Sequence, residues 1–263
     1  MRYAEYPPPP ALAGIVDKFW ILEGQAPGVP EPIIPDGRVE IVLHFGQPFD
    51  RHHTDGRVER QAPALVVGQM RAPICIAPGG TAGVAGIRLA PAATRIVLRC
   101  PAGEITGQFV EIDALCGSTS ILRERLAAAA NDAARVRLLE QWVRARVAAL
   151  PAREVEAAVR AIADSNGAMD LLSIAAHAGI SLRQLERRFL ADVGLTPKVF
   201  ARLVRLQAAL RRISDGEPLA DAAVACGYYD QAHMARDFGH LAETSPTAWR
   251  RYAGVLTPLF VSR

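Results

Sequence analysis

Arginine and glutamine side chains recur on one face of two helix-forming segments in the C-terminal part of the chain. The first segment presents Arg183, Gln184, Arg187 and Arg188, and the second presents Gln231, His233, Arg236 and Asp237. Arginine can donate two hydrogen bonds to the O6 and N7 atoms of guanine, and glutamine can pair with adenine in the same way. Lysine would bring charge without this geometry. These residue types therefore fit base reading in the major groove of DNA.

The two segments belong to an internal repeat. Ser181 and Asp230, Leu185 and Met234, and Phe189 and Phe238 are each 49 residues apart. One such face alone is equally typical of a solvated amphipathic helix. A repeated unit of this length, however, predicts a repeated supersecondary structure, and two matched copies favour the DNA-reading interpretation.

Capping residues predict two short helices with a tight turn in each copy. In the first copy Asp170 is the expected N-cap of one helix, and Ser181 is that of the next. Gln184 would complete a capping box with Ser181, and Gly179 supplies the turn. This arrangement is that of a helix-turn-helix.

The second copy carries the same signals, with Gly227 in the turn and Asp230 as the N-cap. Between the copies, Thr196 and Pro197 predict the start of a helix that continues to Ser214. Such a connector would span roughly 25 Å, which suits two reading helices in successive major grooves.

The part of the chain that contains the repeat resembles the AraC/XylS family of bacterial transcription regulators. The resemblance rests on IAAHAGIS, LERRF, GYYDQAHMARDF and SPTAWRRY, and it covers residues 155–252. It implies a domain of two helix-turn-helix units that binds double-stranded promoter DNA and contacts RNA polymerase. The implied function is sequence-specific regulation of transcription, and the chain is expected not to be an enzyme.

The resemblance also implies which residues contact DNA. The base-reading positions of the first unit correspond to Arg183, Glu186 and Arg187, and those of the second to Ala232, Ala235 and Arg236. The whole predicted DNA-binding set is Ser181, Arg183, Gln184, Glu186, Arg187, Arg188, Asp230, Gln231, His233 and Arg236. Two features depart from the pattern, because neither alanine can hydrogen-bond a base and Glu243 stands where the first copy has Gly194.

Net charge and targeting signals agree with a DNA-binding protein of the cytoplasm. The net charge is +3. It arises wholly in residues 165–263, which contain 12 arginines and lysines and 9 aspartates and glutamates. The first residues lack the apolar region of a signal peptide, and no apolar run approaches the ~20 residues of a membrane-spanning helix. The four cysteines are far apart and are expected to be reduced.

The N-terminal part predicts strands and then helices. Strand-like runs cover residues 15–23, 38–46, 64–70, 72–78 and 82–90, and helical patterns cover 91–100, 120–130 and 133–150. The strings IIPDGRVEIVLHFG and GIRLAP resemble the cupin-like sensor domain found in one branch of the same family. The expected fold class is α+β, with a cupin-like β-barrel or sandwich and following helices in residues 1–150 and an all-α double helix-turn-helix domain in residues 151–263.

The N-terminal domain is expected to bind a small-molecule effector or to pair two chains as a homodimer. Trp20, Phe45 and Arg88 are candidates for lining a cavity, and core packing or an ion pair is the alternative for each. No cofactor is expected. Glu40 and His44 lie four residues apart on one strand face, but the His-x-His pair of a metal-binding cupin is missing, so no metal site is expected.

Two alternatives remain open from the sequence. One is a metal-dependent cupin enzyme with a DNA-binding appendage, for which the histidines 44, 52 and 53 are the available ligands. The other is an architectural DNA binder without sequence preference.

Overall fold

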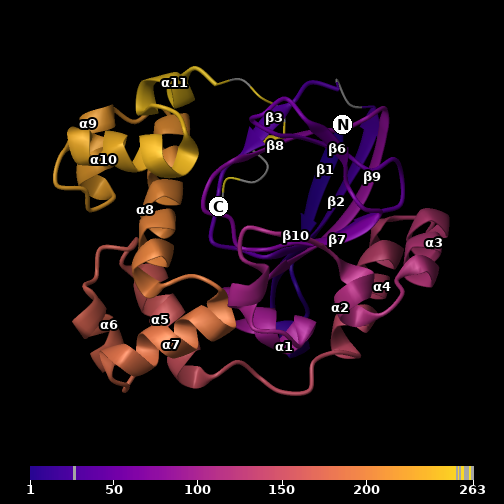
Figure 1. Ribbon diagram of the computed structural model, residues 1–263, viewed down its shortest axis with the longest axis horizontal. Coiled ribbons are helices and arrows are strands. Elements are labelled where there is room, and N and C mark those ends of the chain that lie inside the picture. Colours follow the sequence, from indigo (N-terminus) through magenta and orange to yellow (C-terminus); the bar gives the residue numbers. More distant parts are fainter. Residues whose placement is uncertain (26–27, 253, 255, 258–260, 262–263) are drawn as a thin grey trace.

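The N-terminal part is a sandwich of two antiparallel sheets (Figure 1). The computed structural model describes residues 1–25, 28–252, 254, 256–257 and 261. The six-stranded sheet has the order β1-β2-β9-β4-β7-β10, and the four-stranded sheet has the order β3-β8-β5-β6. Because the described parts of the two sheets share no strand, they form a sandwich rather than a closed barrel.

The strands are β1 (Arg2–Tyr6), β2 (Val16–Gln25), β3 (Glu31–Ile33), β4 (Glu40–His44), β5 (Asp50–His52), β6 (Val58–Arg60), β7 (Ala64–Val67), β8 (Ile74–Ala77), β9 (Thr81–Leu89) and β10 (Phe109–Glu111). The five longer apolar runs predicted as strands are β2, β4, β7, β8 and β9. The sequence missed the other five, because a strand of three to five residues that carries charges or proline shows little alternation.

Alternation along the six-stranded sheet separates two apolar cores. Phe19, Ile21 and Ile87 face the helices, whereas Trp20 and Leu22 face the four-stranded sheet. The indole of Trp20 lies directly on Gly86 of β9: a Cβ atom there would be 1.9 Å from the ring atom Cε2. A side chain at position 86 would therefore displace Trp20 from the sandwich interior.

A buried ionic group stands beside Trp20 in the sandwich interior. Arg88 is 3% exposed and pairs with Glu40 at 2.5 Å and with Asp36 at 3.1 Å. The indole nitrogen of Trp20 donates to Glu40 at 2.9 Å. Of the proposed cavity-lining residues, Arg88 is thus part of a structural ion pair, Trp20 is a core residue, and Phe45 packs under the guanidinium of Arg135.

Helices follow the sandwich and cover the outer face of the six-stranded sheet. They are α1 (Thr94–Leu98), α2 (Ile112–Cys116), α3 (Ser120–Ala128) and α4 (Asp132–Arg144), with 3₁₀ turns at η1 (Pro10–Leu12), η2 (Pro91–Ala93) and η3 (Ala102–Ile105). Leu126, Leu139 and Val143 bring α3 and α4 into the sheet's core. The predicted helical patterns at 91–100, 120–130 and 133–150 correspond to α1, α3 and α4.

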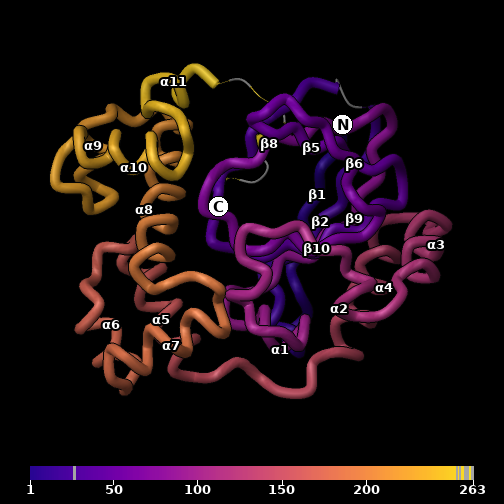
Figure 2. The backbone as a smooth tube through the Cα atoms, in the orientation of Figure 1, coloured from indigo at the N-terminus to yellow at the C-terminus, as the bar shows by residue number. Residues whose placement is uncertain are grey.

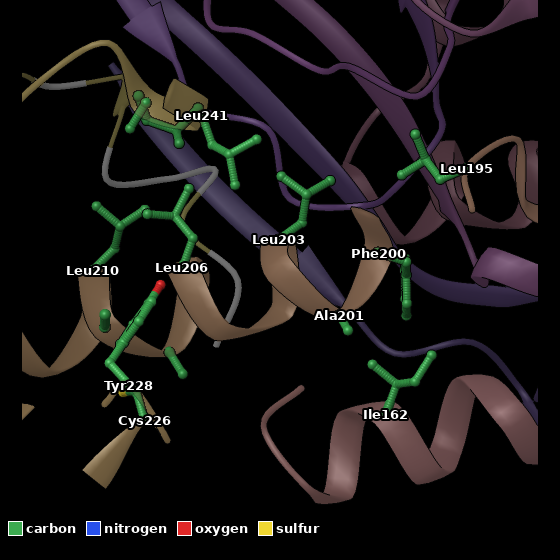
Figure 3. Packing of buried hydrophobic residues seen from close by; sticks show 14 of the residues in the cluster. Ile162, Leu195, Phe200, Ala201, Leu203, Leu206, Leu210, Cys226, Tyr228 and Leu241 are labelled. Atoms are coloured by element: carbon green, nitrogen blue, oxygen red, sulfur yellow. The ribbon is translucent and has the colours of Figure 1, made fainter. Parts of the chain in front are cut away.

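The C-terminal part is helical and is organised around one long helix. Its elements are α5 (Arg153–Asp164), α6 (Leu171–His177), α7 (Leu182–Val193), α8 (Pro197–Ser214), α9 (Leu219–Ala225), α10 (Gln231–Asp237), the π turn η4 (Phe238–Ala242) and α11 (Pro246–Arg250). Figure 2 shows α8 running from the group of α5, α6 and α7 to the group of α9, α10 and α11. In Figure 3, Ala201 of α8 lies above Ile162 at one end, and Leu206 and Leu210 lie near Tyr228 at the other.

The two parts meet along α7 and α8. The side-chain amide of Gln207 donates to the carbonyl of Pro35 at 2.8 Å, and the Thr106 hydroxyl donates to the carbonyl of Gly194 at 2.7 Å. Arg95 of α1 pairs with Asp192 at 3.2 Å. The helix that carries the first reading face is therefore held against the N-terminal part. Among the described residues, no helix is both long and apolar enough to cross a membrane.

His44 predicts a pH dependence of stability. It is fully buried, its Nε2 lies 3.0 Å from Oε1 of Gln61, and burial lowers its pKa to about 4. The unfolded chain therefore binds a proton below the ordinary histidine pKa, whereas the folded chain does so only near pH 4. Stability should fall as pH drops from 6.5 to 4, by about 3 kcal/mol from this group.

Urea unfolding at several pH values tests this. The variant His44→Gln should lose stability at neutral pH and show a flatter decline on acidification, while the exposed His177→Gln control keeps the wild-type slope. Equal slopes in all three proteins would contradict the prediction.

Candidate nucleic-acid interface

The first helix-turn-helix unit consists of α6, its turn and α7, and its predicted caps are confirmed. One oxygen of Asp170 accepts from the backbone nitrogens of Leu172 and Ser173, each at 3.0 Å. Ser181 and Gln184 form the reciprocal capping box, at 3.3 and 3.1 Å. Gly179 has a φ of 69°, the left-handed conformation that a tight turn requires.

The second unit, α9 to α10, repeats this construction. Asp230 caps α10 by accepting from the backbone nitrogen of His233 at 2.6 Å, and Gly227 has a φ of 74°. The apolar residues that match across the repeat, Leu185, Phe189, Met234 and Phe238, lie beneath the two reading helices and are all 0% exposed. The repeat in the sequence is thus a repeat in structure.

Some of the predicted DNA-binding side chains are exposed to solvent, and others are engaged in contacts within the protein. Arg183, Glu186 and Arg187 of α7, and Gln231 and Arg236 of α10, are exposed. The side chains of Ser181, Gln184 and Asp230 are engaged in caps, so they position the helices.

Two further predicted residues have partners within the protein. Arg188 is half-buried and pairs with Glu154 of α5 at 3.0 Å. The ring of His233 packs edge-on against Tyr228, and its Nδ1 accepts from the backbone nitrogen of Tyr229 at 3.4 Å. Both side chains stabilise their units from within.

The placement of Asp237 on the outer reading face is wrong. Its carboxylate is buried and accepts from two nitrogens of Arg202 on α8, at 2.8 and 3.1 Å. Asp237 follows the buried Met234 by three residues, so both lie on the same side of α10. The pair fixes α10 on the connector helix.

A basic groove that the sequence interpretation missed crosses α8. It has a volume of about 790 Å³ and lies between α6, α8 and α10. Its basic lining residues are Lys198, Arg202, Arg205 and Arg236. The spacing of the first three, at i, i+4 and i+7, places them on one face of α8 and was a readable signal. Tyr229, which is 91% exposed, precedes α10 in the turn of the second unit and was also missed.

The two reading helices end differently. α7 ends at Gly194 with a φ of 89°, whereas α10 passes into the π turn η4 before Glu243, which has a φ of 49°. The second reading helix therefore ends differently from the first, as expected, although the residue that ends each one, Gly194 or Glu243, is in the left-handed conformation.

The histidines considered for a metal site are dispersed. His44 is buried inside the sandwich. His52 belongs to β5, and with His53 it lines a cavity of about 550 Å³. Trp249 and Tyr252 of the C-terminal part form another wall of this cavity. Within the described ranges, no group of three or more His, Cys, Asp or Glu side chains is arranged to hold a metal.

Comparisons with protein families divide the chain into two matched regions. Residues 174–252 match the model of a helix-turn-helix domain, and residues 4–111 match that of a domain of unknown function, DUF6597. No curated protein matches the chain.

Solved structures include one with a similar fold over most of the chain. ToxT from Vibrio cholerae is 7% identical, covers 89% of this chain and 98% of its own, and superposes with a TM-score of 0.50. A probable AraC family transcriptional regulator from Rhodopseudomonas palustris is 28% identical over 38% of this chain and 96% of its own, with a TM-score of 0.34. The C-terminal domain of AraT, a response regulator from Geobacillus stearothermophilus, is 22% identical over 40% and 88% respectively, with a TM-score of 0.37.

The different helix ends generate a stability prediction. Glu243 adopts a left-handed conformation that costs a non-glycine residue about 1–2 kcal/mol. Glycine would remove this cost, but it loses more conformational freedom on folding, which offsets part of the gain. Glu243→Gly should therefore raise the free energy of unfolding by about 0.5–1 kcal/mol in chemical denaturation.

The repeat-equivalent change Gly194→Ala serves as the opposite control. It should destabilise the protein, because a Cβ atom there would stand 2.8 Å from the carbonyl oxygen of Ala102. A lower free energy of unfolding for Glu243→Gly would contradict this prediction.

Proposed function

We propose that this chain is a DNA-binding transcription regulator of the AraC family and that it reads two successive major grooves with α7 and α10. The helix-turn-helix match at residues 174–252 supports the family, and the similarity to ToxT supports the fold. The observation that carries the proposal is the pair of capped helices with exposed polar faces on one rigid connector. At 1.5 Å per residue, the 18 residues of α8 span about 27 Å, near the ~34 Å between major grooves on one DNA face.

The first unit carries most of the base discrimination. Arg183 and Arg187 each offer a planar fork for guanine, and Glu186 can accept from the amino group of cytosine. On α10, Arg236 and Gln231 are the exposed hydrogen-bonding side chains among the reading positions and their neighbours. The exposed Ala232 and Ala235 can contribute only apolar contact, for example with a thymine methyl group.

The groove across α8 suits the phosphate backbone. Lys198 and Arg236 both line this groove, and Lys198 is exposed. Such contacts hold the protein in register on the duplex but carry no sequence information directly. We infer that the DNA backbone between the two major grooves passes over Lys198.

The cavity of about 550 Å³ between the sandwich and the second unit is our candidate effector site. Arg51, His52 and His53 line one wall, which favours a small organic anion. Because Glu243 and Trp249 line the opposite wall, a bound molecule would contact both parts of the protein. A ligand that binds one arrangement of the two parts more tightly than another would shift the protein toward that arrangement and so change its affinity for DNA.

The remaining parts of the proposal concern the protein's setting. We place it in the cytoplasm, contacting RNA polymerase when bound at a promoter, with a regulatory rather than a catalytic role. Homodimerisation through the N-terminal domain remains a hypothesis. The boundary between domains 1–150 and 151–263 remains a prediction, and it falls between α4 and α5.

Base reading is tested by removing the free arginines one at a time. Arg183→Ala, Arg187→Ala and Arg236→Ala should each weaken binding to the specific site by about 1–3 kcal/mol and relax preference at one or two base pairs. Sites selected from a random DNA library, followed by titration against matched and mismatched duplexes, provide the measurement. Equal losses on specific and random DNA would assign these arginines to phosphates, and a wild-type protein without any preference would support the architectural alternative.

Two control variants separate the roles of neighbouring residues. Lys198→Ala should weaken binding on all sequences alike and reduce the salt dependence by about one counterion. Arg188→Ala, which breaks the pair with Glu154, should alter stability more than sequence preference.

The effector site is tested by filling the cavity. An organic anion found in a thermal-shift screen should stabilise the wild-type protein and change its affinity for the specific DNA. Cys75 lines the cavity, so Cys75→Phe should abolish the shift while leaving DNA binding by the free protein unchanged. A ligand that stabilises both proteins equally binds elsewhere.

A further inference from the structure

Leu256 and Thr257, which come after α11 in the chain, are buried against the N-terminal sandwich. Leu256, six residues after the last residue of α11, is 1% exposed and belongs to the apolar cluster of the sandwich interior with Trp20, Leu22 and Ile33. The neighbouring Thr257 is 0% exposed. A residue of the C-terminal part thus completes a core of the N-terminal part.

One buried carboxylate organises this contact. Glu31, on the edge strand β3, is 5% exposed, and its Oε2 accepts from the backbone nitrogens of Leu256 at 2.8 Å and Thr257 at 3.2 Å. The Tyr252 hydroxyl lies 3.2 Å from the same oxygen, and the Thr257 hydroxyl also donates to the carbonyl of Pro32. Three donors lie within 3.2 Å of this one carboxyl oxygen, so this is a specific hydrogen-bonded seat and not a loose apolar contact.

Gly254 shows how closely the segment fits. A Cβ atom there would lie 2.2 Å from the hydroxyl oxygen of Tyr252 and 2.4 Å from Oε2 of Glu31. A larger residue at position 254 would therefore have to displace the Tyr252 hydroxyl and the Glu31 carboxylate, which disturbs this hydrogen-bonded contact.

The contact ties the second unit to the sandwich. The first unit is held to the N-terminal part through α7, where Thr106 contacts Gly194 and Arg95 contacts Asp192. Leu256 follows α11 by six residues along the chain, and α11 follows the second unit (Figure 1). With Leu256 in place, both units are anchored to the N-terminal part, and the second unit has this attachment in addition to its packing on α8.

We propose that the space around Glu31 and Trp20 is a ligand site of the N-terminal domain, filled in this structure by the chain's own C-terminal segment. Its ligand class is a short peptide, or a small molecule with the same features: adjacent N–H donors for Glu31 and a branched aliphatic group in the position of Leu256. Such a ligand competes with the segment and releases the second unit. The regulatory consequence, though not the site itself, rests on the proposed function.

The experiment measures binding of the free segment to full-length protein. The probe is an N-acetylated peptide with the sequence of residues 252–263, titrated by calorimetry. Leu256→Asp should vacate the site, so the peptide should bind this variant at least about tenfold more tightly than it binds the wild-type protein. Adding Glu31→Gln to Leu256→Asp should remove the gain.

Gly254→Val disturbs the contact with Glu31 without introducing a charge, and it serves as the second variant if Leu256→Asp does not fold. Ile121→Asp, a change at an exposed position on α3, is the matched charge control and should behave as wild type. The inference fails if the peptide binds no folded variant more tightly than wild type, or if loss of Glu31 has no effect on its binding.

A DNA titration completes the test. Release of the segment should change affinity for the specific site by at least about threefold, whereas the Ile121→Asp control should not. Peptide binding without a change in DNA affinity would overturn the regulatory consequence and keep the site. A wild-type protein that does not bind DNA would overturn the proposed function, and the peptide result would stand apart from it.

Discussion

Packing along α8 is the constraint on which the rest of the structure depends. Neither helix-turn-helix unit is large enough to bury a core alone, and both complete theirs on this helix: Phe200 packs at one end, and Leu206 and Leu210 at the other. Phe189 of α7 meets Phe200 edge-on at 5.4 Å between ring centroids. Because side chains in such a core are close-packed, the spacing of the two reading helices is set by α8 and is not left to flexible loops.

The same helix joins the DNA-binding part to the sandwich. Its Gln207 side chain reaches the carbonyl of Pro35, and Phe200 lies so close to Gly37 that a Cβ atom there would be 2.8 Å from the ring. Ile34 of the sandwich belongs to the α8 core. Contacts therefore run directly from the N-terminal part to the helices of the DNA-binding part, through α8 and through the segment seated on Glu31.

The reading helices of the two units differ in length, in their ends and in their exposed side chains. α7 keeps a full capping box, a glycine at its end and three exposed charged side chains, whereas α10 is shorter, runs into a π turn and exposes two alanines. At the equivalent position of the two helices, Arg188 pairs with Glu154 of α5 and Asp237 pairs with Arg202 of α8. Both units therefore use this position for attachment, and their outer faces differ in the two exposed alanines of α10.

The sequence by itself determined the repeated units, because caps, turn glycines and core spacing are local signals that require only a few neighbouring residues. It also determined the strands β2, β4, β7, β8 and β9 and the surface that carries Arg183, Arg187 and Arg236. It could not show that Arg188 and Asp237 turn inward, since their partners Glu154 and Arg202 are 34 and 35 residues away along the chain. The short edge strand β3 and the seating of Leu256 on Glu31, 225 residues apart, were decided only by the tertiary structure, because contacts at that separation leave no periodic trace in one sequence.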